Sequence, residues 1–449
     1  MKKILIILLF TFNFIFLSSA TSFNGSWEGR LKITPEMSIR VTFNFNESEG
    51  VEPSATMDSP DQGAYGIPVK IDFINSDSIA VSQSQLNLKY TGRLKNDTIE
   101  GHFSQGFLSL PLILTHRTES LSRPQTPVPP FPYLTQEVSF PSALDNANLY
   151  GTVSIPSNSD KNIPFVVFVS GSGLQNRDEE IFGHKPFAVI ADFLSRNGIG
   201  SLRYDDRGFD RKTGLEPNAD TYENAMDALG AINYLQKEGY QNIGMLGHSE
   251  GGLIADIIAC KNHNVKFVVE IGGPSVSGDT ILLFQNEFML KDGKLPEEYV
   301  GIYLEALKGI FDAEKTDASL TFNENDYEIF SENYSKNPVV SPLVKNLREI
   351  KGSLNPWLIY FINYDPKPDI AKIEVSALFI YGENDTQVPP FLNVSPLESL
   401  NPNITVKIYP ELNHLMQHSV TGKINEYSEI EETISPEVLE DIKEFILTH

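Results

Sequence analysis

The spacing of apolar positions first indicates a run of short antiparallel strands near the start of the chain. In residues 38–46, SIRVTFNFN, apolar and polar side chains alternate strictly, and residues 68–74 and 86–94 follow the same period of two. This period is typical of strands with one buried and one exposed face. Clusters of Asn, Gly, Asp and Ser separate the strands. Residues 21–120 are therefore predicted to form a small antiparallel β domain, either a barrel or a sandwich.

A different pattern follows the proline-rich residues 121–133, which are predicted to be an extended and fairly stiff linker. Beyond them, short apolar runs alternate with amphipathic segments. The runs predict strands within residues 164–173, 198–208, 242–249, 265–273, 376–384 and 404–411. The amphipathic segments predict helices within residues 185–198, 221–239, 250–261 and 435–449. This alternation favours an α/β domain with a mostly parallel sheet, built from residues 134–274 and 372–449.

Residues 275–371 interrupt this rhythm. They are predicted to be mostly helical, and they are rich in large apolar side chains. In a doubly wound sheet, an insertion after a central strand lies over the carboxyl edge of the sheet, where ligands bind. We therefore predict a helical cap. Its aromatic side chains are candidates either for lining an acyl pocket or for the cap's own core, and they are Trp357, Tyr360, Phe361 and Tyr364.

The first twenty residues have the features of a secretory signal peptide. Two lysines precede the apolar run ILIILLFTFNFIFL, and the small residues SSA end at Ala20, where a signal peptidase would cut. The run is short for a membrane span, although a retained anchor remains the alternative. The expected location is the periplasm or the outside of the cell, with no stable membrane insertion once residues 1–20 are removed.

Composition and charge narrow the classes of partner. The chain has 449 residues, 41% of them apolar, which is enough for a large core, and its formal net charge is −24. An acidic surface repels nucleic acids and anionic lipids, so neither is an expected partner. Cys260 is the one cysteine, which excludes a disulfide within the chain.

Candidate chemistry begins with the segment NIGMLGHSEGG, residues 242–252. An apolar strand pattern stops at Gly247, Ser249 follows, and a helical pattern starts after it. A G-x-S-x-G sequence at such a junction is typical of a nucleophile elbow, a sharp turn that presents a serine hydroxyl above the edge of the sheet. The alternative is a glycine turn with a purely structural role. We predict that Ser249 is a nucleophile.

A serine hydroxyl needs a base to accept its proton, and the base needs a carboxylate to orient it. Of the eight histidines, His414 lies directly after the last predicted strand, where the base follows such a serine in chain order. Asp385 lies on the loop after the strand before that. Glu383 is the competing acid, but it is closer to its strand. We therefore predict His414 as base and Asp385 as acid.

Two backbone N–H groups are expected to hold the negatively charged oxygen that forms during acyl transfer. The first is that of Glu250, the residue after the nucleophile. The second is assigned to Ser172, because Gly171 and Gly173 on either side of it allow close approach of the backbone. The charged residues of YDDRG, 204–208, are expected to brace the loops beneath the site through ion pairs.

Together these segments resemble the α/β-hydrolase superfamily, and in particular the secreted bacterial serine esterases in which a small β domain precedes the hydrolase. The segments SGSGLQNRDE, GHKPF, LRYDDRG, GHSEGG, GEND and LNHLMQ occur in that group's order. The resemblance covers residues 134–449, and more loosely residues 22–118. It implies an α/β-hydrolase sheet with a cap, and ester hydrolysis by Ser249, Asp385 and His414 without a cofactor. GFDRKTG, 208–214, departs from the group's usual small turn, so the rim of the pocket need not be shared.

The expected function is therefore a serine carboxylesterase that acts through an acyl-enzyme on a small-molecule ester, without cofactor or metal. Short or medium acyl esters are the expected substrates, and acylated sugars are one candidate. The alternatives are a serine peptidase or an acyltransferase of the same fold, and a ligand-binding protein without catalytic activity. The sequence does not identify the acyl group, the alcohol, the oligomeric state or the role of the β domain.

Overall fold

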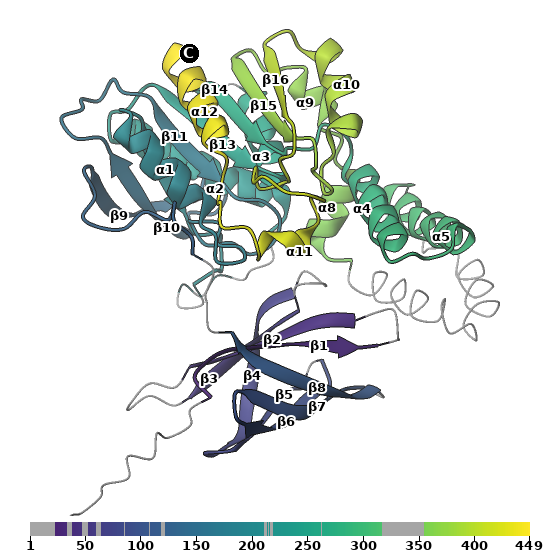
Figure 1. Ribbon diagram of the computed structural model, residues 1–449. Coiled ribbons are helices and arrows are strands. Elements are labelled where there is room, and N and C mark those ends of the chain that lie inside the picture. Colours follow the sequence, from purple (N-terminus) through teal and green to yellow (C-terminus); the bar gives the residue numbers. More distant parts are fainter. Residues whose placement is uncertain are drawn as a thin grey trace, which may run out of the picture. The chain divides into compact units, whose positions relative to one another are not determined.

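The computed structural model in Figure 1 divides into two compact units, residues 1–120 and 121–449. The predicted signal segment, residues 1–20, lies outside the residues that the structure describes. Those residues are 23–33, 38–46, 53–59, 64–84, 86–106, 108–117, 122–210, 213, 215, 219–261, 263–316 and 354–449.

The first unit is a closed antiparallel barrel. Each strand pairs with the next along the chain, and the first strand also pairs with the eighth, which closes the sheet. Closure removes the unpaired edges that an open sheet would expose, and it decides for the barrel over the sandwich. The strands are β1 (Gly25–Lys32), β2 (Ser38–Asn46), β3 (Ser54–Ser59), β4 (Ala64–Ile74), β5 (Ser78–Gln83), β6 (Leu88–Lys95), β7 (Thr98–Gln105) and β8 (Leu108–Arg117).

Alternate side chains of these strands fill the barrel interior. Trp27, Phe43, Tyr90 and Leu114 are among the buried side chains of this core. The hydroxyl of Tyr90 lies 3.2 Å from the carbonyl oxygen of Ile99, so its polar end finds a partner inside the barrel. The period-two pattern of the sequence thus specifies which face of each strand turns inward.

The second unit is built on an eight-stranded sheet in the order β16-β15-β14-β13-β11-β12-β10-β9. The strands from β16 to β12 run parallel, and β10 and β9 join antiparallel at one edge. This arrangement confirms the predicted mostly parallel sheet. The strands are β9 (Leu134–Pro141), β10 (Asn148–Ile155), β11 (Phe165–Val169), β12 (Gly200–Tyr204), β13 (Ile243–His248), β14 (Val265–Ile271), β15 (Ser376–Gly382) and β16 (Ile404–Tyr409).

Helices cover both faces of this sheet, as Figure 1 shows. On one face, α1 (Pro186–Arg196) and α12 (Pro436–Thr448) pack into one hydrophobic core with the strands. On the other, α2 (Thr221–Lys237) and α3 (Glu250–Ala259) pack into a second core. The start of α2 is stabilised by a capping box, in which Asp220 and Glu223 each accept from the other's backbone N–H. Two further helices, α10 (Pro390–Leu400) and α11 (Ile424–Tyr427), follow β15 and β16, respectively.

Between β14 and β15 the described residues form helices. These helices are α4 (Gly278–Asp292), α5 (Glu297–Thr316), α8 (Pro356–Asn363) and α9 (Lys367–Ile370). Part of the predicted cap, residues 317–353, lies outside the described residues. The helices α5 and α8 share a small core that includes Tyr303, Leu307 and Ile362. Across the described residues, none of the helices combines the length and the apolar character that crossing a membrane requires.

The proline-rich segment is attached to the second unit through its polar side chains. Arg123 donates from Nη1 to the carbonyl oxygen of Ile430 at 2.6 Å and from Nη2 to that of Phe182 at 3.0 Å. The amide nitrogen Nε2 of Gln125 donates to the carbonyl oxygen of Ile434 at 2.7 Å. These bonds hold the start of the segment against the α/β domain, so it does not act there as a free spacer.

Candidate active site

Ser249 lies at the junction between β13 and α3, in a backbone conformation with φ 53° and ψ −121°. Positive φ is rare for a residue with a side chain, and holding it costs about 1–3 kcal/mol. The turn is tight enough to require glycine nearby. A Cβ atom on Gly247 would lie 2.1 Å from the carbonyl oxygen of Gly251, and one on Gly251 would lie 2.1 Å from that of Val169. The glycines of the motif therefore allow the sharp strand-to-helix turn.

The predicted acid and base lie together. Nδ1 of His414 is 2.7 Å from Oδ2 of Asp385, and both residues are only 3% exposed. Oδ1 of Asp385 accepts from the backbone N–H groups of Gln387 and Val388, each at 2.8 Å. Glu383, the competing acid, is exposed. Asp385 is therefore fixed by its own loop and aimed at the imidazole.

The imidazole of His414 also depends on a glycine that the sequence reasoning missed. Gly272 follows β14 with φ 59°, and a Cβ atom there would lie 2.9 Å from the ring of His414. A larger residue at this position would displace the ring. The paired glycines after the strand VKFVVEI were the available signal, but a local pattern does not say what approaches them.

A second ion pair, also missed from the sequence, lies beneath the base. Nδ1 of His248 is 2.8 Å from Oε1 of Glu179, and Nε2 of His248 is 3.1 Å from the carbonyl oxygen of His414. Burial alone would lower the pKa of His248, but the charge and hydrogen bond of Glu179 outweigh it and raise that pKa. Glu179 also accepts from the backbone N–H of Gly171 at 2.8 Å. The pair thus connects the loop after β11 to the loop that carries the base.

The loop after β11 is held at both ends by Asp206. Its Oδ1 accepts from the hydroxyl of Ser170 and its Oδ2 from the backbone N–H of Gln175, each at 2.7 Å. Burial raises the pKa of Asp206 to about 8, against the lowering effect of these two bonds. Next to it, Asp205 accepts from the guanidinium of Arg177 at 2.5 Å. Asp205 and Asp206 therefore brace this loop as the sequence predicted, but only Asp205 does so through an ion pair. Arg207 pairs instead with Asp145 and Asp227.

The two predicted oxyanion donors come from different elements, Ser172 from the loop after β11 and Glu250 from the start of α3. Ser172 lines the same cavity as Ser249 and His414. Glu250 is the first residue of α3, where backbone N–H groups have no partner within the helix. Its side chain is buried and forms hydrogen bonds with Thr221 and with Trp357 of α8. The side chain of Glu250 thus contacts the cap, a role that the sequence reasoning did not assign.

The cavity around these residues has a volume of about 200 Å³. One side is apolar and comes from α4 and α8, through Ile281, Leu282, Trp357 and Phe361. The remaining lining is more polar and comes mainly from the loops of the sheet, with His248 from the end of β13 and Gln285 from α4. It consists of Gly171, Ser172, Gln175, Glu179, Ile181, His248, Ser249, Pro274, Gln285, Gln387, Val388, His414 and Leu415. Within the described residues, no group of three or more His, Cys, Asp or Glu side chains could hold a metal ion.

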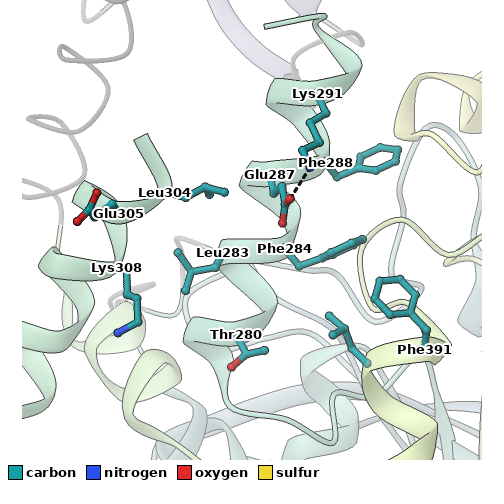
Figure 2. A pocket seen from close by; sticks show the side chains of 11 residues that line it. Thr280, Leu283, Phe284, Glu287, Phe288, Lys291, Leu304, Glu305, Lys308 and Phe391 are labelled. Atoms are coloured by element: carbon teal, nitrogen blue, oxygen red, sulfur yellow. Dashed lines mark ion pairs between the residues drawn. The ribbon is translucent and has the colours of Figure 1, made fainter. Parts of the chain in front are cut away.

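A larger groove on α4 does not include any of the predicted catalytic residues. It has a volume of about 800 Å³ and lies between α4, α5 and the start of α10. Figure 2 shows Phe284, Phe288 and Phe391 at this groove, with the ion pair between Glu287 and Lys291 near its end. The helix α4 thus contributes residues to both the small cavity and the groove. The cavity at Ser249, although smaller, is where the candidate chemistry lies.

Comparison with known proteins identifies the fold family to which the chain belongs. Residues 164–419 match the family model of the alpha/beta hydrolase fold. Esterase EstD of Thermotoga maritima is 28% identical over 273 residues, which are 60% of this chain and 58% of that protein, so the chain spans less than two thirds of this relative. The solved structure of Est1E from Butyrivibrio proteoclasticus is 15% identical, with a TM-score of 0.38, over 69% of this chain and 98% of that chain. The solved structure of the Pyrococcus furiosus esterase Pf2001 is 16% identical, with a TM-score of 0.40, over 70% of this chain and 93% of that chain.

Proposed function

Because this chain belongs to the α/β-hydrolase fold family, we propose that it is a serine carboxylesterase that forms an acyl-enzyme. The observation that carries the proposal is the 2.7 Å contact between His414 and Asp385 in the cavity that Ser249 also lines. The name of the Thermotoga maritima relative, an esterase, supports the same chemistry.

In the proposed reaction, Nε2 of His414 accepts the proton of the Ser249 hydroxyl while the serine oxygen attacks the ester carbonyl. Asp385 accepts from Nδ1–H, which holds the ring in the required tautomer and stabilises its protonated form. His414 then gives the proton to the leaving alcohol. The same histidine next activates water, which hydrolyses the acyl-enzyme and regenerates Ser249.

The negatively charged oxygen of each tetrahedral intermediate needs preorganised donors. We assign these donors to the backbone N–H groups of Ser172 and Glu250. Asp206 supports the first by holding both ends of its loop, and the N-terminal end of α3 supports the second. Preorganisation matters because donors that need no rearrangement stabilise the charge as it forms.

The cavity also bears on the substrate. Its volume of about 200 Å³ is below the range of about 300–1,000 Å³ that is usual for sites of drug-sized ligands. Apolar side chains of the cap form one side of it. We therefore assign a short acyl group to the cap side and place the alcohol toward the polar loops.

The test is the variant Ser249→Ala, assayed on p-nitrophenyl acetate beside the wild-type protein. We expect a loss of kcat of at least about 10⁴-fold, because the nucleophile is removed. A fluorophosphonate probe should label the wild type and not the variant. Full activity in the variant would refute the proposal, and turnover of chromogenic peptides faster than of esters would favour a peptidase instead.

A further inference from the structure

A second cavity adjoins the catalytic one, and Trp357 lies between them. The second cavity has a volume of about 380 Å³, nearly twice the catalytic volume of about 200 Å³. Two residues, Trp357 and Ser172, line both. The indole therefore forms part of a wall that separates the small catalytic space from a larger space beside it.

Glu250 fixes this indole by hydrogen bonds. Nε1 of Trp357 lies 2.9 Å from both carboxylate oxygens of Glu250, and the hydroxyl of Thr221 donates to Oε1 at 2.7 Å. Glu250 is only 2% exposed. Burial raises its pKa, while the hydrogen bonds of Thr221, Ser172 and Trp357 act to lower it. A buried carboxylate needs these partners, so removing the indole donor would leave part of its hydrogen-bonding capacity unused.

Packing holds the indole from a second direction. Its ring stacks on that of Phe361, with centroids 5.5 Å apart and planes 16° from parallel. Phe361 is buried and lines the catalytic cavity, but it does not line the second one. The hydrogen bonds to Glu250 and the ring contact with Phe361 together restrict the indole to one orientation in the wall.

We infer that Trp357 is a specificity-determining residue, which limits the acyl group to short chains by closing the catalytic cavity toward the second cavity. The inference rests on the proposed esterase function and adds a size limit to it. A longer acyl chain in the wild type meets the indole, which the bonds to Glu250 keep in place. In a tightly fitted pocket, one methylene changes discrimination by about 10- to 200-fold.

The experiment measures kcat/KM for p-nitrophenyl acetate, butyrate, hexanoate and octanoate. We expect Trp357→Ala to raise the octanoate-to-acetate ratio at least about tenfold, because the two cavities become continuous. Trp357→Leu should raise it less, since leucine fills part of the space. Trp357→Phe removes the bonds to Glu250 and part of the indole but keeps a six-membered aromatic ring in the wall, so we expect the smallest rise from it.

Ile359→Ala is the matched control, because Ile359 is an exposed residue of the same helix that lines neither cavity. The octanoate-to-acetate ratio of this variant should stay within a factor of about two of the wild-type ratio. If general loosening of α8 caused the effect, the ratio of the control would rise as well. Unchanged ratios in the Ala and Leu variants, with an active wild type, would overturn the inference. A wild type that hydrolyses none of the four esters would refute the proposed function itself.

Discussion

At the scale of single residues, the position of a carboxylate decides whether it can orient the imidazole of His414, since Asp and Glu side chains can both accept its hydrogen bond. Asp385 and Glu383 are two residues apart after β15, and either can accept from an imidazole. Asp385 is buried at 2.7 Å from His414, whereas Glu383 is exposed. Two backbone N–H groups of the Asp385 loop donate to its Oδ1 atom. These bonds fix the carboxylate so that Oδ2 points at the ring of His414.

Replacing Asp385 by Asn tests this arrangement. The amide has the same shape but one of its ends donates, so the ring loses the acceptor that stabilises its protonated form. We expect kcat for p-nitrophenyl acetate to fall by about 10⁴-fold. The control Glu383→Gln, on the exposed side, should stay within about twofold of the wild type. The reverse order of effects would show that the acid is misassigned.

At the scale of elements, the loop after β11 depends on the residues that follow β12. These strands are neighbours in the sheet, so the carboxyl ends of both lie at the same edge. Asp206 uses this proximity to bind Ser170 and the backbone of Gln175 at once. A loop of glycines and serines has little packing of its own, so these bonds determine where its N–H groups point.

The variant Asp206→Ala removes both of the carboxyl oxygens that hold this loop. We expect kcat to fall by about 10- to 100-fold with a smaller change in KM, because misplaced oxyanion donors act on the transition state. Ser170→Ala removes one of the two bonds and should cost less. Steady-state kinetics of both variants provide the measurement. A rise in KM of the same size, with kcat unchanged, would instead indicate a role in substrate binding only.

The parts of the site that could be predicted from the sequence are those set by local patterns and by the order of the strands. The elbow, its flanking glycines and the order of Ser249, Asp385 and His414 are local patterns or follow from the order of strands. The contacts of Glu179 with His248 and of Glu250 with Trp357 are not local, because their partners lie 69 and 107 residues apart. Neither pair follows a periodic pattern, so the sequence offered no sign of them.

At the scale of the whole molecule, segments far apart in the chain complete the second unit. His184, just before α1, lies 3.0 Å from the hydroxyl of Thr433 and 3.0 Å from the carbonyl oxygen of Tyr427. Its ring is fully buried, and this burial lowers its pKa from 6.5 to about 4. The folded protein therefore binds this proton less readily than the unfolded chain does.

The consequence is a loss of stability in mild acid. Since the pKa of His184 is lower in the folded state, its contribution is fully present above pH 6.5 and is lost as the pH falls toward 4. The free energy of unfolding that this pKa difference can remove at low pH is at most about 3 kcal/mol. We expect the free energy of unfolding in urea to fall less between pH 7.5 and 5 in His184→Gln than in the wild type.

Thr433→Val separates the titration from the hydrogen bond. It removes one hydrogen-bond partner of His184 but keeps the carbonyl of Tyr427 and a buried ring. This variant should therefore be less stable than the wild type at pH 7.5 and retain the same fall toward pH 5. If His184→Gln showed the wild-type pH dependence, other groups would account for it.

The sequence alone determined the class of the elements that its periodic segments mark and the α/β fold of the second unit. Period two in the first part predicted antiparallel strands, and alternating apolar runs and amphipathic helices predicted the mostly parallel sheet, because burial of one face or two imposes these periods locally. The resemblance to α/β hydrolases is confirmed by the family match over residues 164–419. Only the tertiary structure decided that β1 pairs with β8 to close a barrel, and that Trp357 lies on Glu250 between two cavities. Such pairings depend on how distant segments pack, and packing energy is a property of the assembled fold, which no short stretch of sequence contains.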